Sequence, residues 1–413
     1  MKLKNKYNLL AFLYYIAWCT IGGFVAVILK DKGVSNTLIG IVTASGCVSS
    51  IFLAPYLSTL VTESDKLSIK KVLNIVFGIL MILFTLINFV KIPTICVVIF
   101  YIIINALLIS VGPFLQTLAS SYMQAGYDVN FGFARGLGSV SWAITALIFG
   151  FFIDMFSSKV LGVGFIISAI LTLLILNTLP EVSKFKGGKK KGGSAFTIVK
   201  KYKVYFFLLL GFSFCLSAAS SIGTYLINIV TSLGGSESFY GVAVFIMAFS
   251  EMPVMAISPW LMKKYKTIDL IVVGALCYVI RNVTMCLAPN LPILCVGMIF
   301  QGFSFGLFTA VITYYVIYNI DVEDQAMGQT MITVMNSGFG STIGNLLGGI
   351  LQDMFGLTGM YAFIISCTII GFLVVCYGKW LSKNPQYSLE IKRWHTLTTC
   401  ANAKKWELLA QCN

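Results

Sequence analysis

The stretch PEVSKFKGGKKKGGSAFTIVKKYK, residues 180–203, is the longest interruption between the apolar runs of this chain. Lysine and glycine dominate it, and this composition is typical of a solvated linker. A window of about 20 residues, the length of a helix that crosses a bilayer, finds six apolar runs before the stretch and six after it. These runs cover residues 8–29, 36–60, 72–90, 95–118, 136–155, 161–179, 204–232, 239–262, 268–287, 293–318, 330–352 and 358–381.

The composition of the whole chain is that of a membrane protein. Of its 413 residues, 58% are hydrophobic and 11% are charged, and the mean hydropathy is +0.90, far above the range of soluble domains. The sequence therefore predicts an all-α polytopic membrane protein with 12 transmembrane helices in two six-helix bundles. We expect an N-terminal bundle at 1–179, a cytoplasmic basic linker at 180–203, a C-terminal bundle at 204–381 and a cytoplasmic tail at 382–413.

The chain has a net charge of +14, and the positions of its lysines indicate its orientation in the membrane. If the first span starts inside, most of them fall on the cytoplasmic side, at residues 2–6, 66–71, 184–203 and 263–266 and in the tail. The other side holds only Lys30, Lys32, Lys91 and Lys159. The positive-inside rule then places both termini in the cytoplasm, and we expect a multi-pass protein of the cell membrane with the lipid bilayer as its surroundings. Nucleic-acid binding is not expected, because no aromatic-interleaved basic face accompanies the lysines.

The two halves also share a short sequence echo. Residues 150–156 read GFFIDMF and residues 349–355 read GILQDMF, so Gly, Asp, Met and Phe recur at a constant offset of 199 positions. Together with the equal number of apolar runs, the echo indicates two parallel repeats. Transporters built from such repeats place the substrate site near the membrane midplane, between the halves.

Small residues recur at helical spacing in two of the expected spans. They predict close helix crossings, because small side chains let helix backbones approach inside a membrane. These residues are Gly340, Gly344 and Gly348 in one span and Ser213, Ser217, Ser221 and Thr224 in the other.

Glu251 and Arg281 lie well inside apolar runs, where each charge costs about 2.5–3.5 kcal/mol on insertion scales, and Arg135 is a third candidate at the edge of a run. Glu251 lies near the middle of the eighth run and Arg281 lies in the ninth, whereas Arg135 lies near the start of the fifth. One interpretation is a buried Glu251–Arg281 ion pair that only holds helices together. The other is that both residues face a central cavity and bind a substrate or a proton, since intramembrane ionisable groups mark transport pathways.

Arg135, Ser139 and Trp142 follow one another at i, i+4 and i+7, so one helix face carries a cation, a hydroxyl and an indole. Such a set suits a small polar ligand with an apolar face, because arginine offers a planar donor fork and tryptophan a stacking surface. The alternative is an arginine and a tryptophan anchored at the membrane interface.

Two sequence signatures of enzymes are absent. The chain has no G-x-x-x-x-G-K-[ST] loop for ATP and no H-E-x-x-H. Its single histidine, His395, lies in the expected tail, and its 11 cysteines show no paired spacing. We therefore expect neither an enzyme nor a protein with a metal site or cofactor.

The stretch FGFARGLGSVSWA, residues 131–143, resembles the start of the fifth helix in the lactose-permease-like branch of the major facilitator superfamily, where F-G-R-A-R-x-x-G-x-x-x-W is typical. Arg135 and Trp142 stand at the sugar-contacting positions of that pattern. The stretch ESDKLSIKK, residues 63–71, is similar to the loop between helices two and three of the superfamily, with Asp65 at its acidic gating position. Val61 replaces the usual glycine four residues before Asp65.

The resemblance extends over residues 8–381 and gives roles to the other charged residues. Glu251 looks like the helix-eight glutamate that binds substrate and is coupled to protonation, and Arg281 looks like the helix-nine arginine that helps to set this protonation. The lactose-permease pattern has a glutamate at the position of Gln116, and a histidine and a second glutamate at Gln301 and Ser304. These departures argue against lactose itself and against the standard proton relay.

The resemblance implies a secondary transporter that acts by alternating access, with proton-coupled symport of a small polar solute: a sugar, a nucleoside or an aromatic or organic acid. We expect the chain to act as a monomer. Arg135 and Trp142 would orient the solute, Glu251 would carry the proton with Arg281 beside it, and Gln116, Gln301, Asn105 and Ser139 would add hydrogen bonds. The alternatives are an uncoupled facilitator, an efflux transporter of the same fold, and a non-transporting membrane sensor or scaffold that signals through its tail.

Overall fold

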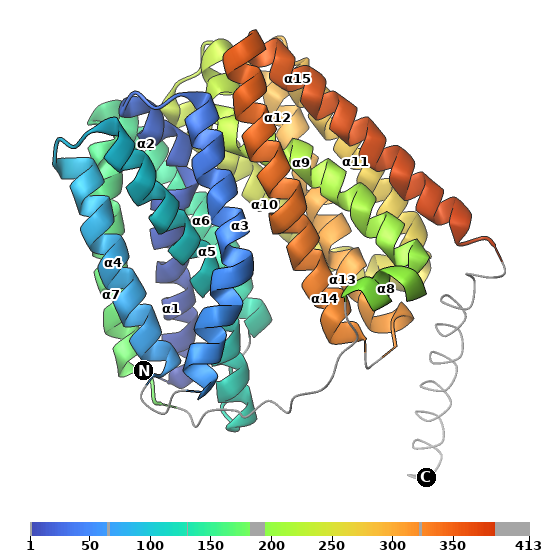
Figure 1. Ribbon diagram of the computed structural model, residues 1–413, viewed down its shortest axis with the longest axis horizontal. Helices are drawn as coiled ribbons and strands as arrows, with labels where there is room; N and C mark the ends of the chain where they lie inside the picture. Colours follow the sequence, from blue (N-terminus) through green and yellow to red (C-terminus); the bar gives the residue numbers. More distant parts are fainter. Residues whose placement is uncertain (1, 64–66, 130, 182–194, 322–323, 385–413) are drawn as a thin grey trace.

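The computed structural model describes residues 2–63, 67–129, 131–181, 195–321 and 324–384. These residues are almost entirely helical, and the helices of the N-terminal half lie beside those of the C-terminal half (Figure 1). The expectation of an all-α polytopic membrane protein is confirmed. The predicted gating-loop residue Asp65 and nearly all of the expected tail lie outside the described residues.

The helices of the N-terminal half begin and end within a few residues of the predicted apolar runs. They are α1 (Leu3–Trp18), the π-helical turn η1 (Cys19–Gly23), α2 (Val25–Asp31), α3 (Asn36–Glu63), α4 (Ile69–Phe89), α5 (Thr94–Gln124), α6 (Phe131–Met155) and α7 (Lys159–Thr178).

The helices of the C-terminal half also correspond to the predicted apolar runs, but more of them are interrupted. It contains α8 (Ala195–Lys201), α9 (Lys203–Ser232), α10 (Glu237–Lys264), α11 (Thr267–Cys286), α12 (Leu291–Ile299), η2 (Gly302–Gly306), α13 (Leu307–Asn319), α14 (Gln325–Thr333), η3 (Val334–Ser341) and α15 (Thr342–Leu381).

Ten of the described helices are long and apolar enough to cross a membrane, or 11 if the pair Leu3–Gly23 and Val25–Asp31, bent by 45°, is one span. One of the ten is the 55-residue segment Met327–Leu381, although about 20 residues suffice for a crossing. Inside it, Gly356 has φ 68° and ψ −167°, a backbone conformation that favours glycine and that interrupts a regular helix. The count of 12 spans stays a prediction.

Three π-helical turns interrupt the α-helical segments of the residues that the structure describes. Each π turn places one additional residue in the helix, and such turns are frequent at functional sites. The turn η2 directly follows Gln301, and η3 directly follows Thr333. Both of these residues take part in the candidate site described below.

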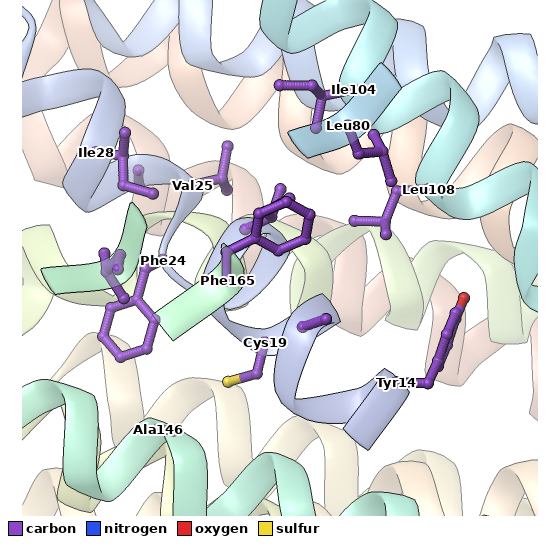
Figure 2. Close-up of a cluster of buried hydrophobic side chains, with 14 of the residues drawn as sticks. Tyr14, Cys19, Phe24, Val25, Ile28, Leu80, Ile104, Leu108, Ala146 and Phe165 are labelled. Carbon is purple, nitrogen blue, oxygen red and sulfur yellow. The ribbon is translucent and has the colours of Figure 1, made fainter. Parts of the chain in front are cut away.

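The core of the N-terminal half is built from apolar side chains of several helices. Leu80 of α4, Leu108 of α5 and Phe165 of α7 belong to one buried cluster, which also includes Tyr14 of α1 (Figure 2). The rings of Phe84 and Phe165 meet edge to face, with their centroids 5.2 Å apart. This packing fixes the position of α1, which forms one wall of the candidate site.

The two rows of small residues predicted from the sequence meet each other, between α9 and α15. A Cβ atom on Gly344 would lie 2.0 Å from the carbonyl oxygen of Ser217, and one on Gly348 would lie 2.1 Å from the hydroxyl oxygen of Ser221. Only glycine fits at such distances. The prediction of a close helix crossing is therefore confirmed, and the crossing joins the two rows to one another.

This crossing gives a stability prediction. We expect Gly344→Ala to lower the free energy of unfolding by about 1–3 kcal/mol, because the added methyl group forces two backbones apart. Gly223→Ala on α9 is the matched control, since a Cβ at Gly223 meets nothing within 4 Å. Apparent melting temperatures of the detergent-purified variants measure the difference. Equal melting temperatures for the two variants would contradict the close crossing.

The last part of the predicted linker contains a short helix, α8. The short helix α8 packs against α9 and α14. The ammonium of Lys201 lies 2.7 Å from the Asp324 carboxylate, and hydrogen bonding to Asp324 raises the pKa of Lys201 above its ordinary value. Tyr202 donates a hydrogen bond to the Asp321 carboxylate at 3.0 Å. A helix of seven residues is too short to be found by a window sized for membrane spans.

Candidate functional site

A cavity of about 400 Å³ opens beside α1, α5 and α6. Its lining includes Thr333 at the end of α14, so it reaches both halves of the chain. Aromatic side chains from α1 form one wall, and polar groups from α5 and α6 form another. The residues that matter for the chemistry are Tyr7, Tyr14, Tyr15, Trp18, Gln116 and Arg135.

Arg135 brings the positive charge to this cavity. Its Nη1 atom donates a hydrogen bond to the Ser139 hydroxyl at 3.0 Å, as their spacing on the helix predicts. Its guanidinium carbon lies 5.1 Å from the centre of the Tyr15 ring, a cation–π distance. No carboxylate lies within 4.0 Å of Arg135 among the described residues. Its donors on the cavity side are therefore available to a solute.

Aromatic rings continue from the cavity into the protein. Tyr15 and Trp18 have ring centroids 5.6 Å apart, and Trp18 meets Trp142 edge to face at 5.7 Å. Trp142 thus lies behind Trp18 rather than on the cavity surface. Gly23 allows this arrangement, because a Cβ there would lie 3.2 Å from the Trp142 ring.

Tyr14 adds an unsatisfied polar atom to the same wall. Its ring packs into the cluster of Figure 2, and its buried hydroxyl has no hydrogen-bond partner among the described residues. A buried hydroxyl without a partner costs about 1–3 kcal/mol. A polar solute in the cavity, which Tyr14 lines, would offset this cost.

Glu251 and Gln301 form a second polar group, in the C-terminal half. Gln301 Nε2 donates a hydrogen bond to Glu251 Oε1 at 2.7 Å. Gly302 makes this possible, because a Cβ on it would lie 2.1 Å from the Ser250 carbonyl oxygen. The Gly302 amide also donates to the Ser250 hydroxyl at 3.1 Å. The start of η2 is therefore held against α10, and Gln301 is held beside Glu251.

Arg281 is close enough to Glu251 for the two charges to interact, but it makes its hydrogen bond elsewhere. It is 1% exposed, and its Nη1 atom donates to the Asn282 side chain at 2.9 Å. Asn282 in turn donates to the Thr368 hydroxyl at 2.7 Å. The ion pair with Glu251 considered above is absent from the described part of the chain. A role of Arg281 in protonation stays a prediction.

Asn105 is not among the residues that line the cavity. It packs at the contact between α5 and α3, where a Cβ on Gly46 would lie 2.6 Å from the Asn105 Cβ. It is 6% exposed, and its Nδ2 atom has no partner among the described residues. Its expected hydrogen bond to a solute stays a prediction.

Sequence analysis missed the aromatic wall of α1. Tyr7, Tyr14, Tyr15 and Trp18 follow one another at intervals of seven, one and three positions, which places them on one helix face. This spacing was available in the sequence. It was hidden because aromatic residues are common at lipid-facing positions of membrane helices as well as in their cores.

Metal ligation has no support in the ranges that the structure covers. They contain no group of three or more His, Cys, Asp or Glu side chains that could hold an ion. The nine cysteines within them are free.

A family model described as the MFS_1 like family matches residues 5–364. The chain belongs to this family. The resemblance to the major facilitator superfamily is therefore confirmed, and the chain is a multi-pass membrane transporter rather than an enzyme.

The MFS_1-like chain is 22% identical to the maltose permease of Geobacillus stearothermophilus over 384 residues, which is 90% of this chain and 93% of the permease. It is 25% identical to the nucleoside permease NupG of Escherichia coli K12 over 389 residues, 87% of this chain and 90% of NupG.

Solved structures show the same fold. A mutant form of the nucleoside transporter NupG superposes on this MFS_1-like chain with a TM-score of 0.77 and 19% identity, covering 92% of this chain and 99% of the NupG chain. A D-xylose–proton symporter superposes with a TM-score of 0.65 and 14% identity, covering 91% of this chain and 96% of that chain. At these identities the likeness carries the architecture alone.

Proposed function

We propose that this MFS_1-like transporter is a proton-coupled symporter of a ring-shaped polar solute, a sugar or a nucleoside, which it carries by alternating access of its two halves. One observation carries the proposal: a cavity that reaches both halves holds a guanidinium with no carboxylate partner among the described residues, against a wall of aromatic rings. The similarity to a maltose permease and a nucleoside permease supports the solute class.

The cavity provides the two kinds of contact that such a solute needs. The planar fork of Arg135 donates to hydroxyl or carbonyl oxygens, and Gln116 on the same cavity wall adds an amide. Tyr15 and Trp18 offer ring faces to a sugar or a base, and stacking on a base is worth about 1–3 kcal/mol. Trp142 supports Trp18 from behind, so its contribution to binding is indirect.

Glu251 is the proposed proton carrier. It lies within the apolar helix α10, half-buried, with an amide rather than a cation at its carboxylate. An ionisable group at such depth marks a proton or substrate pathway. Rocking of the two halves would change the water and charge around Glu251 and so let it bind and release a proton on opposite sides.

Ligand screening by thermal stability tests the solute class. A solute that binds only the folded protein raises its apparent melting temperature, by an amount that grows with concentration. We expect uridine, adenosine or maltose to raise it in the wild type and to leave that of Arg135→Gln unchanged. A response to aromatic carboxylates alone would contradict the proposal and favour an anionic substrate at Arg135.

An uncoupled facilitator is the second candidate, because of the position of Arg281. No described carboxylate lies within ion-pair distance of this arginine, so the residue that the resemblance assigns to setting the protonation of Glu251 does not pair with it in this conformation. A facilitator would exchange solute across proteoliposomes without accumulating it against a gradient. Symport would accumulate solute when the outside is acidic.

We also propose that the protein lies in the plasma membrane. In the proposed orientation, both termini are in the cytoplasm. The lysine asymmetry of the sequence supports this orientation. The cavity then opens toward the cytoplasm, because Tyr7 and Arg135 lie near the starts of α1 and α6.

A further inference from the structure

The sequence echo at residues 150–156 and 349–355 lies where the two halves of the transporter touch. In α6, of the N-terminal half, the Asp154 carboxylate accepts hydrogen bonds from the amide of Ser238, at 2.9 Å, and from its hydroxyl. Ser238 is in the first turn of α10, of the C-terminal half. The Asp154 carboxylate thus covers the start of a helix from the opposite half.

Asp353, the aspartate of the second echo, makes the equivalent contact between the halves. In α15, of the C-terminal half, its carboxylate accepts from the Thr37 amide at 2.6 Å and from the Asn36 side chain at 2.8 Å. These residues start α3, of the N-terminal half. Thr37 and Ser238 are 201 positions apart and Asp154 and Asp353 are 199 apart, so one repeat relates both partners of the contact.

The glycine four residues before each aspartate brings the backbones together. A Cβ on Gly150 would lie 2.8 Å from the Glu237 carbonyl oxygen, and one on Gly349 would lie 2.3 Å from the Asn36 carbonyl oxygen. The partner helices have glycines in matching places. A Cβ on Gly40 would lie 2.5 Å from the Asn345 carbonyl oxygen, and one on Gly241 would lie 2.5 Å from that of Ala146.

Both contacts lie at the end of the molecule that is opposite to the cavity mouth. Figure 1 shows α2 and the middle of α15 at one end, with α8 and α14 at the other. The contacts involve the end of α6 and the start of α3, whereas the cavity is lined by residues near the starts of α1 and α6. The two contacts therefore join the halves at the end away from the cavity mouth.

We propose that Asp154 and Asp353 are two equivalent latches that hold this end of the transporter closed, and that both must release for the cavity to open there. A carboxylate at a helix start gains from the aligned peptide dipoles and from charge-assisted hydrogen bonds. Because each aspartate and its helix belong to different halves, this stabilisation exists only while the halves touch. The latches therefore favour the closed state over the open one.

Distances between spin labels test the latches without any substrate, so the result is independent of the proposed solute and coupling. Labels at Ser157 and Ser232, exposed positions at this end in the two halves, are placed in a variant with the native cysteines replaced. We expect Asp154→Asn and Asp353→Asn each to raise the ratio of open to closed molecules about fivefold. The double variant should show about the product of the two changes.

The control for charge loss is Asp269→Asn, because Asp269 pairs with Lys379 at 2.8 Å within the C-terminal half. Its distance distribution should match that of the unsubstituted labelled protein.

Gly150→Ala is a second test of the contact, since its methyl group would meet the backbone of α10. Its control is Gly136→Ala on the same helix, where the added methyl group meets nothing within 4 Å. We expect Gly150→Ala, and not Gly136→Ala, to lengthen the distance.

Two results would overturn the latches. One is a double aspartate variant that folds and keeps the wild-type distance distribution. The other is a shift produced by only one of the two aspartates, since the repeat requires both to contribute. If the double variant does not fold, the two single variants decide by the same criterion.

Discussion

Replacing Arg135 by Gln lowers the affinity for the transported solute by about 10- to 100-fold. The expectation follows from the charge-assisted hydrogen bonds that the guanidinium would donate in the cavity, each worth about 1.5–3 kcal/mol. No described carboxylate lies within ion-pair distance of Arg135, so the loss of its donors falls on the solute. Equilibrium binding of labelled solute to the purified protein measures the change.

Lys264→Gln is the matched control for Arg135→Gln. Lys264 also lies over an aromatic ring, 5.5 Å from the centre of Trp260, but at the end of α10 and outside the cavity lining. Loss of its charge should leave solute affinity unchanged. Equal losses in the two variants would show that general charge, rather than the Arg135 contact, governs binding.

Arg135→Lys separates charge from shape at the same position. Lysine keeps the positive charge but loses the planar fork of the guanidinium. It therefore cannot donate to Ser139 and to a solute at the same time in one fixed geometry. We expect most of the affinity loss to persist. Full affinity in Arg135→Lys would mean that the site needs only a point charge, as for a small anion.

Glu251→Gln removes accumulation of solute and substrate-driven proton flux while leaving solute exchange intact. Glutamine has nearly the shape of glutamate and can still pair with the Gln301 amide that now contacts Glu251 at 2.7 Å. It cannot bind and release a proton, so the proton gradient no longer contributes free energy to transport. Proteoliposomes loaded with a pH indicator measure both fluxes, and the inside and outside solute concentrations should become equal.

Asp128→Asn serves as the control for loss of a carboxylate. Asp128 is exposed and pairs with Lys4 at 3.2 Å, away from α10. Accumulation should persist in this variant. Undiminished proton flux in Glu251→Gln would exclude Glu251 as the carrier, and equal defects in accumulation and exchange would point to a binding role alone.

The positions of most helices could be predicted from the sequence because membrane spans are long apolar runs with clear ends. The predicted run at 161–179 and the helix Lys159–Thr178 show the agreement, to within two residues at each end. The contact of Arg135 with Ser139 was predictable for a similar reason, since both lie on one helix at a fixed spacing. Local periodicity carries this information.

Contacts between distant helices were not predictable in the same way. Nothing in the residues around Arg281 indicates that Asn282 and Thr368 form its surroundings, because Thr368 lies on another helix. The pairing of Glu251 with Gln301 joins residues 50 positions apart. Asp154 and Asp353 stand at the ends of apolar runs, and their partners in the opposite half became visible only in three dimensions.

The π-helical turn after Gln301 determines how insertions and deletions at this point would affect the helix that follows. Consecutive residues of an α-helix are rotated by about 100°, so the one extra residue of η2 shifts the angular phase of everything that follows. Deleting one residue between Gly302 and Gly306 would restore a regular helix and turn α13 relative to α12. Insertions and deletions at this point therefore change which side chains of α13 face the interior, without any substitution in α13 itself.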